Sequence, residues 1–198
     1  MVKTQIQARG ISDPGVLRAM GTLPRHLFVD PSLASRAYDD HPLPIGLGQT
    51  ISQPYIVALM AEALELRGTE RVLEVGSGCG YMAAVLSRLA KEVFGLELEP
   101  ELHRRSRARL DGLGAANVAL RCGDGRLGWP EAAPFDAILL SCAADRVPPA
   151  LWAQLAMGGK LLLPLARHPG HQDLVLVTKT PEGPVALDLL AVVFVPLR

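Results

Sequence analysis

The chain has 198 residues, of which 49% are apolar, and this is enough to bury the core of one globular domain. Its 20 acidic and 20 basic residues balance, so no overall charge draws the protein to nucleic acid or to an anionic membrane surface. The sequence also lacks the run of roughly 20 apolar residues that a membrane-spanning helix needs, which excludes an integral helical membrane protein.

Apolar runs typical of strands alternate with helical spacing from about residue 55 onward, a pattern that favours a parallel sheet covered by helices. Residues 1–54 are expected to form a cap of short helices and loops within the same domain, which spans 1–198. Predicted helices lie at 56–64, after the glycine turn near 85–89, at 99–113 and at 149–157. Predicted strands lie at 71–75, 93–98, 118–122, 135–141, 160–165, 174–178 and 189–195. The predicted fold is α/β, with a doubly wound, Rossmann-like sheet of about seven strands whose last two form an antiparallel hairpin around the turn at 181–184.

Three glycines, Gly76, Gly78 and Gly80, lie between the first predicted strand and the helix that follows it. Missing side chains let a ligand approach the backbone there, although a tight turn made only for packing needs glycine as well. The spacing differs from the G-x-G-x-x-G pattern of dinucleotide sites. Glu97 ends the next predicted strand, near the offset of about 20 residues at which a carboxylate meets a ribose. Glu99 competes for this role, but the offset favours Glu97.

Ser52 precedes Gln53 and Pro54, at the expected start of the first long helix. This position predicts that Ser52 is the N-cap residue of that helix. The positive end of a helix is also a ready site for a carboxylate, so Ser52 could contact a substrate instead of, or as well as, capping. The residue pattern alone leaves both interpretations open.

The segments LPIGLGQTISQP (43–54) and VLEVGSGCGY (72–81) together resemble the protein-L-isoaspartate O-methyltransferase family. Further matches in the same order lie at 23–29, 37–40, 128–130, 133–136 and 154–159. Met82 and the segment 141–144 depart from the family pattern. The sequence given stops at Arg198, so we expect less cover over a cofactor than longer members provide.

The resemblance implies a class I methyltransferase fold with S-adenosylmethionine as cofactor, S-adenosylhomocysteine as product and no metal. It implies that Ser52 is the catalytic residue and that Ser52 and Val195 bind the substrate. Asp124 matches the position of an adenine contact, although Gly123-Asp124-Gly125 could equally be an ordinary turn. The full set of residues expected to bind the cofactor is Thr50, Ile51, Ser52, Glu74, Gly76, Ser77, Gly78, Gly80, Glu97, Leu98, Asp124 and Gly125.

The implied activity is methyl esterification of the free carboxylate of L-isoaspartyl residues in damaged peptides and proteins, which initiates repair through a succinimide. Two alternatives remain open: carboxyl methylation of a dedicated peptide in natural-product maturation, and a non-catalytic regulatory module that only binds S-adenosylmethionine. The expected partners are isoaspartyl peptides and proteins, with no nucleic acid or membrane, and the expected state is a monomer. The three cysteines form no CxxC pair, which indicates free thiols in the cytoplasm.

Three further groups of residues are assigned plain structural roles. The arginines at 104, 105, 107 and 109 are interpreted as a solvated helix face because acidic residues share their helix. His168 and His171 lack other nearby ligands, so no metal site is predicted there. His26 is expected to pack or to bond within its loop.

Overall fold

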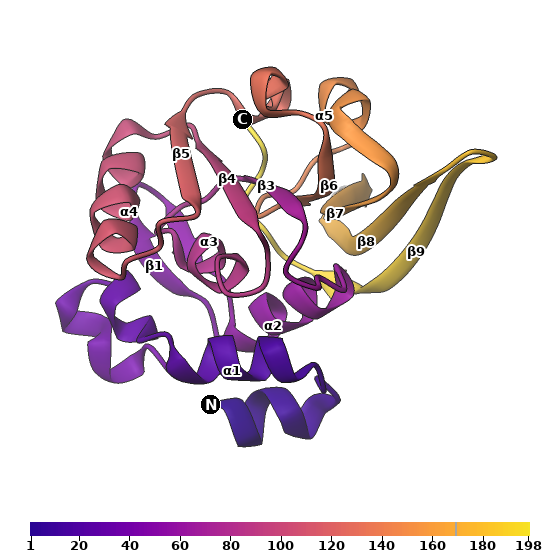
Figure 1. Cartoon of the computed structure of the whole chain (residues 1–198). Coiled ribbons are helices and arrows are strands. Elements are labelled where there is room, and N and C mark those ends of the chain that lie inside the picture. Colours follow the sequence, from indigo (N-terminus) through magenta and orange to yellow (C-terminus); the bar gives the residue numbers. More distant parts are fainter. Residues whose placement is uncertain (169) are drawn as a thin grey trace.

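A seven-stranded sheet forms the centre of the computed structural model, which describes residues 1–168 and 170–198 (Figure 1). The strand order is β5-β4-β3-β6-β7-β8-β9. The five strands from β5 to β7 are parallel, whereas β8 is antiparallel to both β7 and β9. The strands are β3 (Arg71–Val75), β4 (Glu92–Glu97), β5 (Val118–Cys122), β6 (Phe135–Leu140), β7 (Leu155–His168), β8 (His171–Thr180) and β9 (Gly183–Val192). The predicted doubly wound sheet with an antiparallel edge is therefore confirmed.

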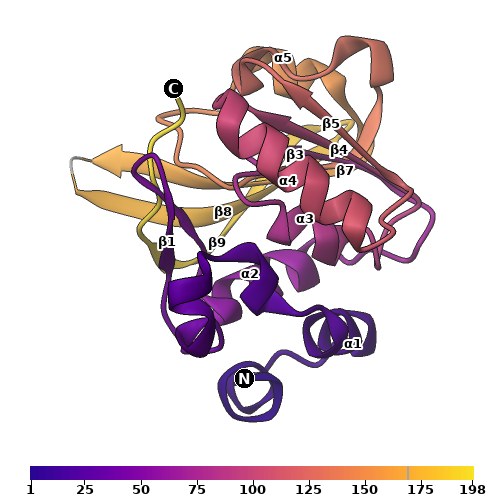
Figure 2. The ribbon, with the colours of Figure 1, turned by 90° about the vertical axis from the view of Figure 1, so that its left-hand side faces the viewer.

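Five α-helices, several short helical turns and a small hairpin surround this sheet. The α-helices are α1 (Pro14–Thr22), α2 (Pro54–Ala63), α3 (Tyr81–Leu86), α4 (Pro100–Gly112) and α5 (Pro149–Gln154). The short turns are η1 (Val2–Ile6), η2 (Gln7–Arg9), η3 (Arg25–Phe28), η4 (Pro31–Arg36), η5 (Gly125–Leu127) and η6 (Pro130–Ala132). The hairpin consists of β1 (Leu43–Gly46) and β2 (Gln49–Ile51), and Figure 2 shows it rising beside the C-terminal segment. Within the described residues, no helix combines the length and the apolar character needed to cross a bilayer.

Several element boundaries differ from the prediction. The helix expected near 85–89 is α3, which ends at Leu86, and β7 and β8 extend beyond the predicted 160–165 and 174–178 at both ends. The helix expected over 149–157 ends at Gln154, because Leu155 pairs with Phe135 and joins the sheet as the start of β7. Sheet pairing here overrides the local helical spacing. The last strand begins at Gly183 and ends at Val192, whereas the apolar run predicted 189–195. Its first half, residues 183–187, is mostly exposed although these residues are not polar, because β9 is an edge strand held by backbone pairing to β8.

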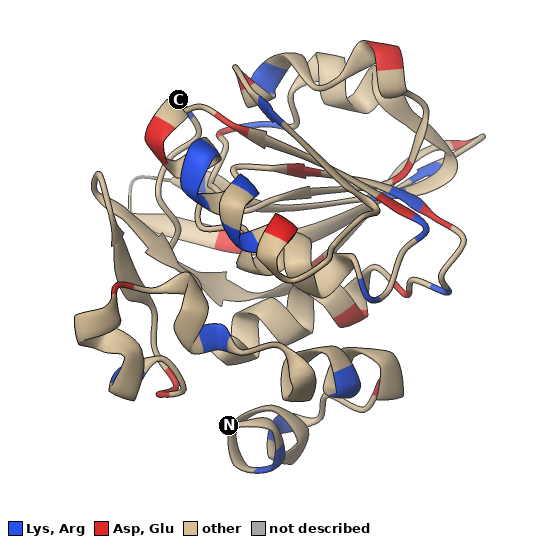
Figure 3. Cartoon of the chain, turned by 60° about the vertical axis from the view of Figure 1, so that its left-hand side comes forward, with Lys and Arg blue, Asp and Glu red and all other residues tan. Residues whose placement is uncertain are grey.

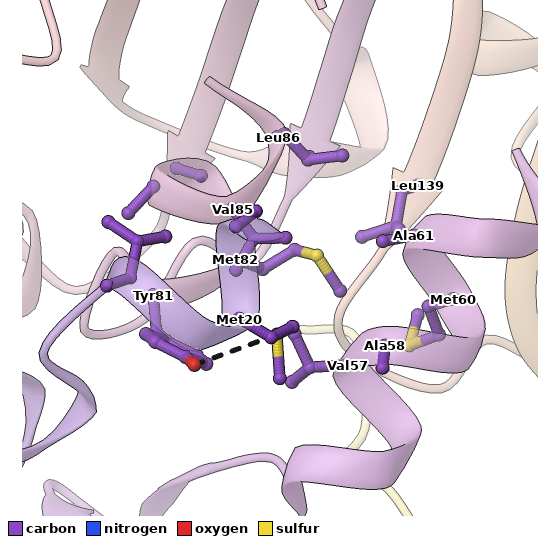
Figure 4. Packing of buried hydrophobic residues seen from close by; sticks show 14 of the residues in the cluster. Met20, Val57, Ala58, Met60, Ala61, Tyr81, Met82, Val85, Leu86 and Leu139 are labelled. Atoms are coloured by element: carbon purple, nitrogen blue, oxygen red, sulfur yellow. Dashed lines mark hydrogen bonds between the residues drawn. The ribbon is translucent and has the colours of Figure 1, made fainter. Parts of the chain in front are cut away.

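The central strands are buried on both faces, which explains their almost continuous apolar sequences. Successive residues point to opposite faces: Val72 belongs to one buried cluster and Leu73 to the other, and Leu139 and Leu140 divide in the same way. The first cluster joins the sheet to α1, α2 and α3. Figure 4 shows this packing, including the hydroxyl of Tyr81 3.7 Å from the sulfur of Met20. The N-terminal cap is thus part of the main core.

Helix α4 carries charged residues along its outer side (Figure 3). Arg104 pairs with Glu101, as predicted for a solvated face. The prediction is wrong for Arg105 and Arg109, because they extend inward: Arg105 Nη1 donates to the carbonyl of Ile45, and Arg109 Nη1 donates to that of Cys79. Half of the predicted surface arginines therefore fasten loops near the carboxyl ends of the strands.

Candidate functional site

The carboxyl ends of β3, β4 and β6 meet where the strand order reverses. The chain passes from β3 to β4 on one side and later enters β6 on the other side, so a crevice forms between them, and open α/β sheets bind ligands at this point. Three adjoining cavities lie there, with volumes of about 70, 750 and 40 Å³. Thr50 and Ser141 line all three. We call them the turn cavity, the open cavity and the inner cavity, in that order.

The turn cavity lies against the glycine turn that follows β3. Gly76 and Gly78 both have positive φ, +82° and +53°, which side chains rarely adopt. A Cβ on Gly76 would lie 3.3 Å from the sulfur of Cys142, and one on Gly78 would lie 3.3 Å from Ile45 Cδ1. Both glycines line this cavity, and because they have no side chain a ligand can approach the backbone there.

Gly80 has a different position from the other two glycines. It precedes the first residue of α3 with φ of +87°, and a Cβ there would lie 3.1 Å from Cβ of Ser106 on α4. Gly80 lines none of the three cavities. The structure thus shows it packing α3 against α4, and a contact with the cofactor stays a prediction.

Glu97 closes the other side of the turn cavity. Its side chain is buried, one carboxylate oxygen accepts the N–H of Gly78 at 2.7 Å, and the other accepts the N–H of Glu99 at 3.0 Å. Leu98 lines the cavity beside it. The competing Glu99 lines none of the cavities and pairs with Arg198. The sequence offset therefore selected the acidic residue that the fold turns toward the crevice.

Glu74 lies at the wall of the inner cavity and is fully buried. Its Oε1 accepts the hydroxyl of Ser141 at 3.1 Å, whereas its Oε2 has no hydrogen-bond partner among the described residues. Burial raises the pKa of Glu74 to about 8, and the nearby Glu97 adds to this rise. Ser77, whose hydroxyl also has no partner there, lines the same cavity. These unpartnered oxygens fit a ligand that brings a cation or hydrogen-bond donors.

Asp124 is engaged elsewhere. Both of its carboxylate oxygens accept bonds from the guanidinium of Arg126, at 2.9 and 2.7 Å, and this pairing lowers the pKa of Asp124. Asp124 caps η5 and lines none of the cavities. Gly125 does line the turn cavity, and a Cβ there would lie 2.3 Å from Val75 Cγ1. The adenine contact of Asp124 stays a prediction that this conformation does not display.

Ser52 does not cap α2, so the prediction of an N-cap serine is wrong. The N-cap residue is Gln53, and its side chain makes no capping bond to the first turn of the helix. Pro54 disfavours helical dihedrals in the residue before it, so Gln53 becomes the extended cap, with ψ of 138°. Among the described residues, the hydroxyl of Ser52 forms no hydrogen bond, and the half-buried residue lines both the inner and the open cavity. Ser52 is therefore free to contact a ligand between them.

The open cavity separates the cap from the end of the sheet. Ser52 and Thr50 line one side of it, and Gln172, Phe194 and Val195 line the other. The side-chain amide of Gln172 forms two bonds with the backbone of Phe194: it donates to the carbonyl at 3.1 Å and accepts the N–H at 2.7 Å. The carbonyl of Val195 accepts the N–H of Ala143 at 2.8 Å. The segment beyond β9 is thus fixed opposite Ser52.

Sequence reasoning missed Ser141, Gln172 and Phe194 as site residues. Ser141 could have been found, because it ends the strand beside β3 and so must reach the crevice. Gln172 carries no such signal, since its role depends on the backbone of Phe194, 22 residues later. Ile51 lines the inner cavity, and its contact with the cofactor stays a prediction.

The remaining candidates keep structural roles. His171 pairs with Asp173, and in the part of the chain that the structure describes no group of three or more potential metal ligands gathers. His26 bonds the hydroxyl of Tyr38 at 2.7 Å, as expected for a loop contact. Cys79 and Cys142 are buried free thiols, and Cys122 is an exposed one.

Comparisons with known proteins agree on one family. A family model described as Protein-L-isoaspartate(D-aspartate) O-methyltransferase (PCMT) matches residues 1–198. "Protein-L-isoaspartate O-methyltransferase 2" of Anaeromyxobacter sp. (strain Fw109-5) is 59% identical over 198 residues, which cover all of this chain and 82% of the relative. "Protein-L-isoaspartate O-methyltransferase" of Methylorubrum populi is 56% identical and is covered to 92%.

Solved structures of proteins described as members of this family are also similar to the chain. A protein-L-isoaspartate O-methyltransferase superposes with a TM-score of 0.89 at 31% identity, over 99% of this chain and 65% of that one. A protein described as a putative protein-L-isoaspartate O-methyltransferase from Plasmodium falciparum, in complex with S-adenosyl-L-homocysteine, gives a TM-score of 0.84 at 27% identity, over 100% and 96% of the two chains.

Proposed function

The chain belongs to the protein-L-isoaspartate(D-aspartate) O-methyltransferase family, and we propose that it transfers a methyl group from S-adenosylmethionine to the free carboxylate of L-isoaspartyl residues in peptides and proteins. One observation in the structure carries the proposal: the hydroxyl of Ser52 bonds none of the described residues and lies between the inner cavity and the open cavity. This is the position in which one group can contact a cofactor on one side and a substrate on the other.

The residues around the turn and inner cavities fit S-adenosylmethionine. Glu74 and Ser77 supply buried oxygens that have no partner in the part of the chain that the structure describes, and these oxygens suit the ammonium of an amino-acid moiety. Glu97 retains acceptor capacity beyond its two backbone bonds and suits a ribose diol. The proposed contacts also include Thr50, Ile51, Ser52, Gly76, Gly78, Leu98 and Gly125, which line these cavities, and Gly80 and Asp124, which rest on family resemblance alone.

S-adenosylmethionine, when bound, supplies an electrophilic methyl group carried by a sulfonium sulfur. The isoaspartyl carboxylate has an unperturbed pKa of about 4 and is ionised near neutral pH, so the protein needs no general base. The hydroxyl of Ser52 can donate one hydrogen bond that holds one carboxylate oxygen and leaves the other directed at the methyl group. An arginine in its place would bind more strongly and weaken the nucleophile. Ser52 therefore orients, and its contribution is alignment.

The open cavity suits a peptide. Its volume of about 750 Å³ exceeds that of the two cofactor cavities, and it is bounded on the far side by the extended segment around Val195. We propose that the backbone of Val195 holds the substrate chain while its isoaspartyl carboxylate lies at Ser52. The following backbone nitrogen then attacks the resulting methyl ester, which loses methanol and closes to a succinimide without help from the enzyme, and hydrolysis of that ring returns part of the product to normal aspartate. We further propose that the enzyme acts in the cytoplasm as a monomer, in keeping with its three free cysteines.

The proposal is tested by transfer of a labelled methyl group from S-adenosylmethionine to one peptide prepared in isoaspartyl and normal aspartyl forms. The two forms differ only in linkage, so the normal form is the matched control. We expect base-labile label in the isoaspartyl form alone. Cofactor binding without transfer to either form would contradict the proposal and favour a dedicated peptide substrate or a non-catalytic module.

A further inference from the structure

Arg25 is a fully buried charged residue at the start of η3, outside the cavities described above. Its Nη2 donates a hydrogen bond of 2.7 Å to the carbonyl of Ser52. Its Nε donates a second bond of 2.7 Å to the carbonyl of Ala37. Among the described residues, no carboxylate pairs with Arg25. Burying a guanidinium without a counterion lowers the stability of the folded protein, so we expect the two bonds to carbonyls to contribute something in return.

The same guanidinium also stacks on Tyr81, a residue of the inner cavity wall. Its central carbon lies 4.9 Å from the centre of the Tyr81 ring. Tyr81 is the first residue of α3, directly after the glycine turn, and it lines the inner cavity together with Ser52. Arg25 therefore joins the main chain of Ser52 to the first turn of the helix that follows the glycine turn.

A bond to the carbonyl of Ser52 acts directly on the proposed reaction geometry. It fixes the peptide plane between Ser52 and Gln53, and with it the direction of the Ser52 side chain. In a second contact, the side chain of Gln53 donates a bond of 3.0 Å to the carbonyl of Asp40. The Arg25 bonds and this Gln53 bond together hold residues 52–53 against the 37–40 loop. Ser52 needs such support, because its own hydroxyl makes no bond among the described residues.

We propose that Arg25 is the positioning residue of Ser52, and that it sets the serine hydroxyl relative to the methyl-donor cavity through the Ser52 carbonyl. The planar guanidinium of arginine can donate to two carbonyls and stack on the Tyr81 ring at the same time. A lysine at position 25 would keep the positive charge but could not make these three contacts together. The inference rests on the proposed methyl transfer. It goes beyond that function because it assigns a role to a residue that touches neither substrate nor cofactor cavity.

The kinetic test uses Arg25→Lys, with Arg71→Lys as the matched control. Arg71 also bonds a carbonyl, that of Pro134, and stacks on an aromatic ring, but at the far end of β3. A misplacement of about 1 Å can lower a rate about 10²-fold. We expect Arg25→Lys to lower kcat on the isoaspartyl peptide by about this factor with S-adenosylhomocysteine affinity retained, and Arg71→Lys to lower only Tm.

A double-mutant cycle separates positioning from general stability. In the Ser52→Ala background the hydroxyl to be positioned is absent, so Arg25→Lys should cause no further loss of the residual transfer rate. An additive loss in the double variant would overturn the proposal. So would a variant in which kcat, Tm and S-adenosylhomocysteine affinity fall together, because Arg25 would then be a general structural residue.

A measurement without turnover keeps this test separate from the proposed function. A thiol introduced by Ser52→Cys, in a Cys122→Ser background that removes the exposed native thiol, reports local geometry by its rate of reaction with a small maleimide. We expect Arg25→Lys to change this rate several-fold and Arg71→Lys to leave it unchanged; equal rates would contradict the role of Arg25. Failure of the wild type to methylate would contradict the proposed function, while the thiol rates would still decide the role of Arg25.

Discussion

Ser141 Oγ lies 3.1 Å from Glu74 Oε1, and this bond joins the carboxyl end of β6 to β3 at the point where the cavities meet. The other oxygen of Glu74 has no partner among the described residues. Because the pKa of Glu74 is raised to about 8, its carboxyl group is largely protonated near neutral pH until a cation arrives. The proposed contact of Glu74 with the cofactor should therefore make cofactor binding depend on pH.

Binding of S-adenosylhomocysteine should therefore release a proton at neutral pH. The ammonium of the ligand favours the charged form of Glu74 and lowers its pKa. Calorimetry in two buffers of different ionisation enthalpy measures the release. We expect a release of up to one proton at about pH 7, which disappears in Glu74→Gln. Equal binding enthalpies of the wild type in the two buffers would contradict this assignment.

Glu74 should also make stability depend on pH in a defined direction. Its pKa in the folded protein, about 8, lies above the ordinary value of 4.5 for a glutamate, so the folded state holds the proton more tightly than the unfolded state. This contribution is complete below about pH 4.5 and is lost as pH rises through about 8, at up to about 1.4 kcal/mol per pH unit. Urea unfolding should show Glu74→Gln gaining stability relative to wild type across that window. Parallel curves would refute the raised pKa, and Glu131→Gln, at an exposed ion pair, serves as the control.

Ser52→Ala should lower methyl transfer by at least about tenfold and leave both S-adenosylhomocysteine affinity and stability nearly unchanged. The reason is that the hydroxyl makes no capping bond. Asp13→Ala is the matched control, since Asp13 does cap α1 by accepting the N–H of Val16 at 2.8 Å. That control should lose about 1 kcal/mol of unfolding free energy and keep its kcat. A similar stability loss in Ser52→Ala would restore the capping interpretation.

Glu97→Gln should weaken S-adenosylhomocysteine binding at least about tenfold, whereas Glu99→Gln should not. Glu97 lines the turn cavity, and Glu99 instead pairs with Arg198. In the Gln variant the amide NH₂ faces one of the two backbone N–H groups that Glu97 accepts, so one hydrogen bond is lost. The free energy of unfolding must therefore be measured together with the calorimetric affinity. Equal effects of the two substitutions would show that the ribose assignment is wrong.

Gly125→Ala should weaken cofactor binding because its Cβ would approach Val75 Cγ1 to 2.3 Å and displace a wall of the turn cavity. Gly123→Ala is the control, since nothing lies within 4 Å of a Cβ there. Adding Val75→Ala to Gly125→Ala should restore part of the affinity by making room. The assignment fails if the two single glycine variants bind S-adenosylhomocysteine alike.

The sequence predicted the sheet well because parallel strands covered on both faces are continuous apolar runs. The range 71–75 and the range 118–122 match β3 and β5. Glu97 was also predictable, because strand length and turn length fix its distance from the glycine turn.

The rest of the site depends on contacts between distant segments. Arg25 bonds Ser52, 27 residues later, only after the N-terminal cap that contains both residues has folded, and Gln172 meets Phe194 only after β8 and β9 pair. Neither contact leaves a local pattern. The capping prediction for Ser52 failed for a local reason, since Pro54 shifts the helix start by one residue.

The most direct test of repair by this protein follows the fate of one isoaspartyl peptide by chromatography and mass spectrometry during incubation with enzyme and S-adenosylmethionine. We predict loss of the isoaspartyl form, transient methyl ester and succinimide, and accumulation of the normal aspartyl form, with all of these changes at least about tenfold slower in Ser52→Ala. An isoaspartyl peptide that stays unchanged, or a normal aspartyl peptide methylated at the same rate, would contradict the account.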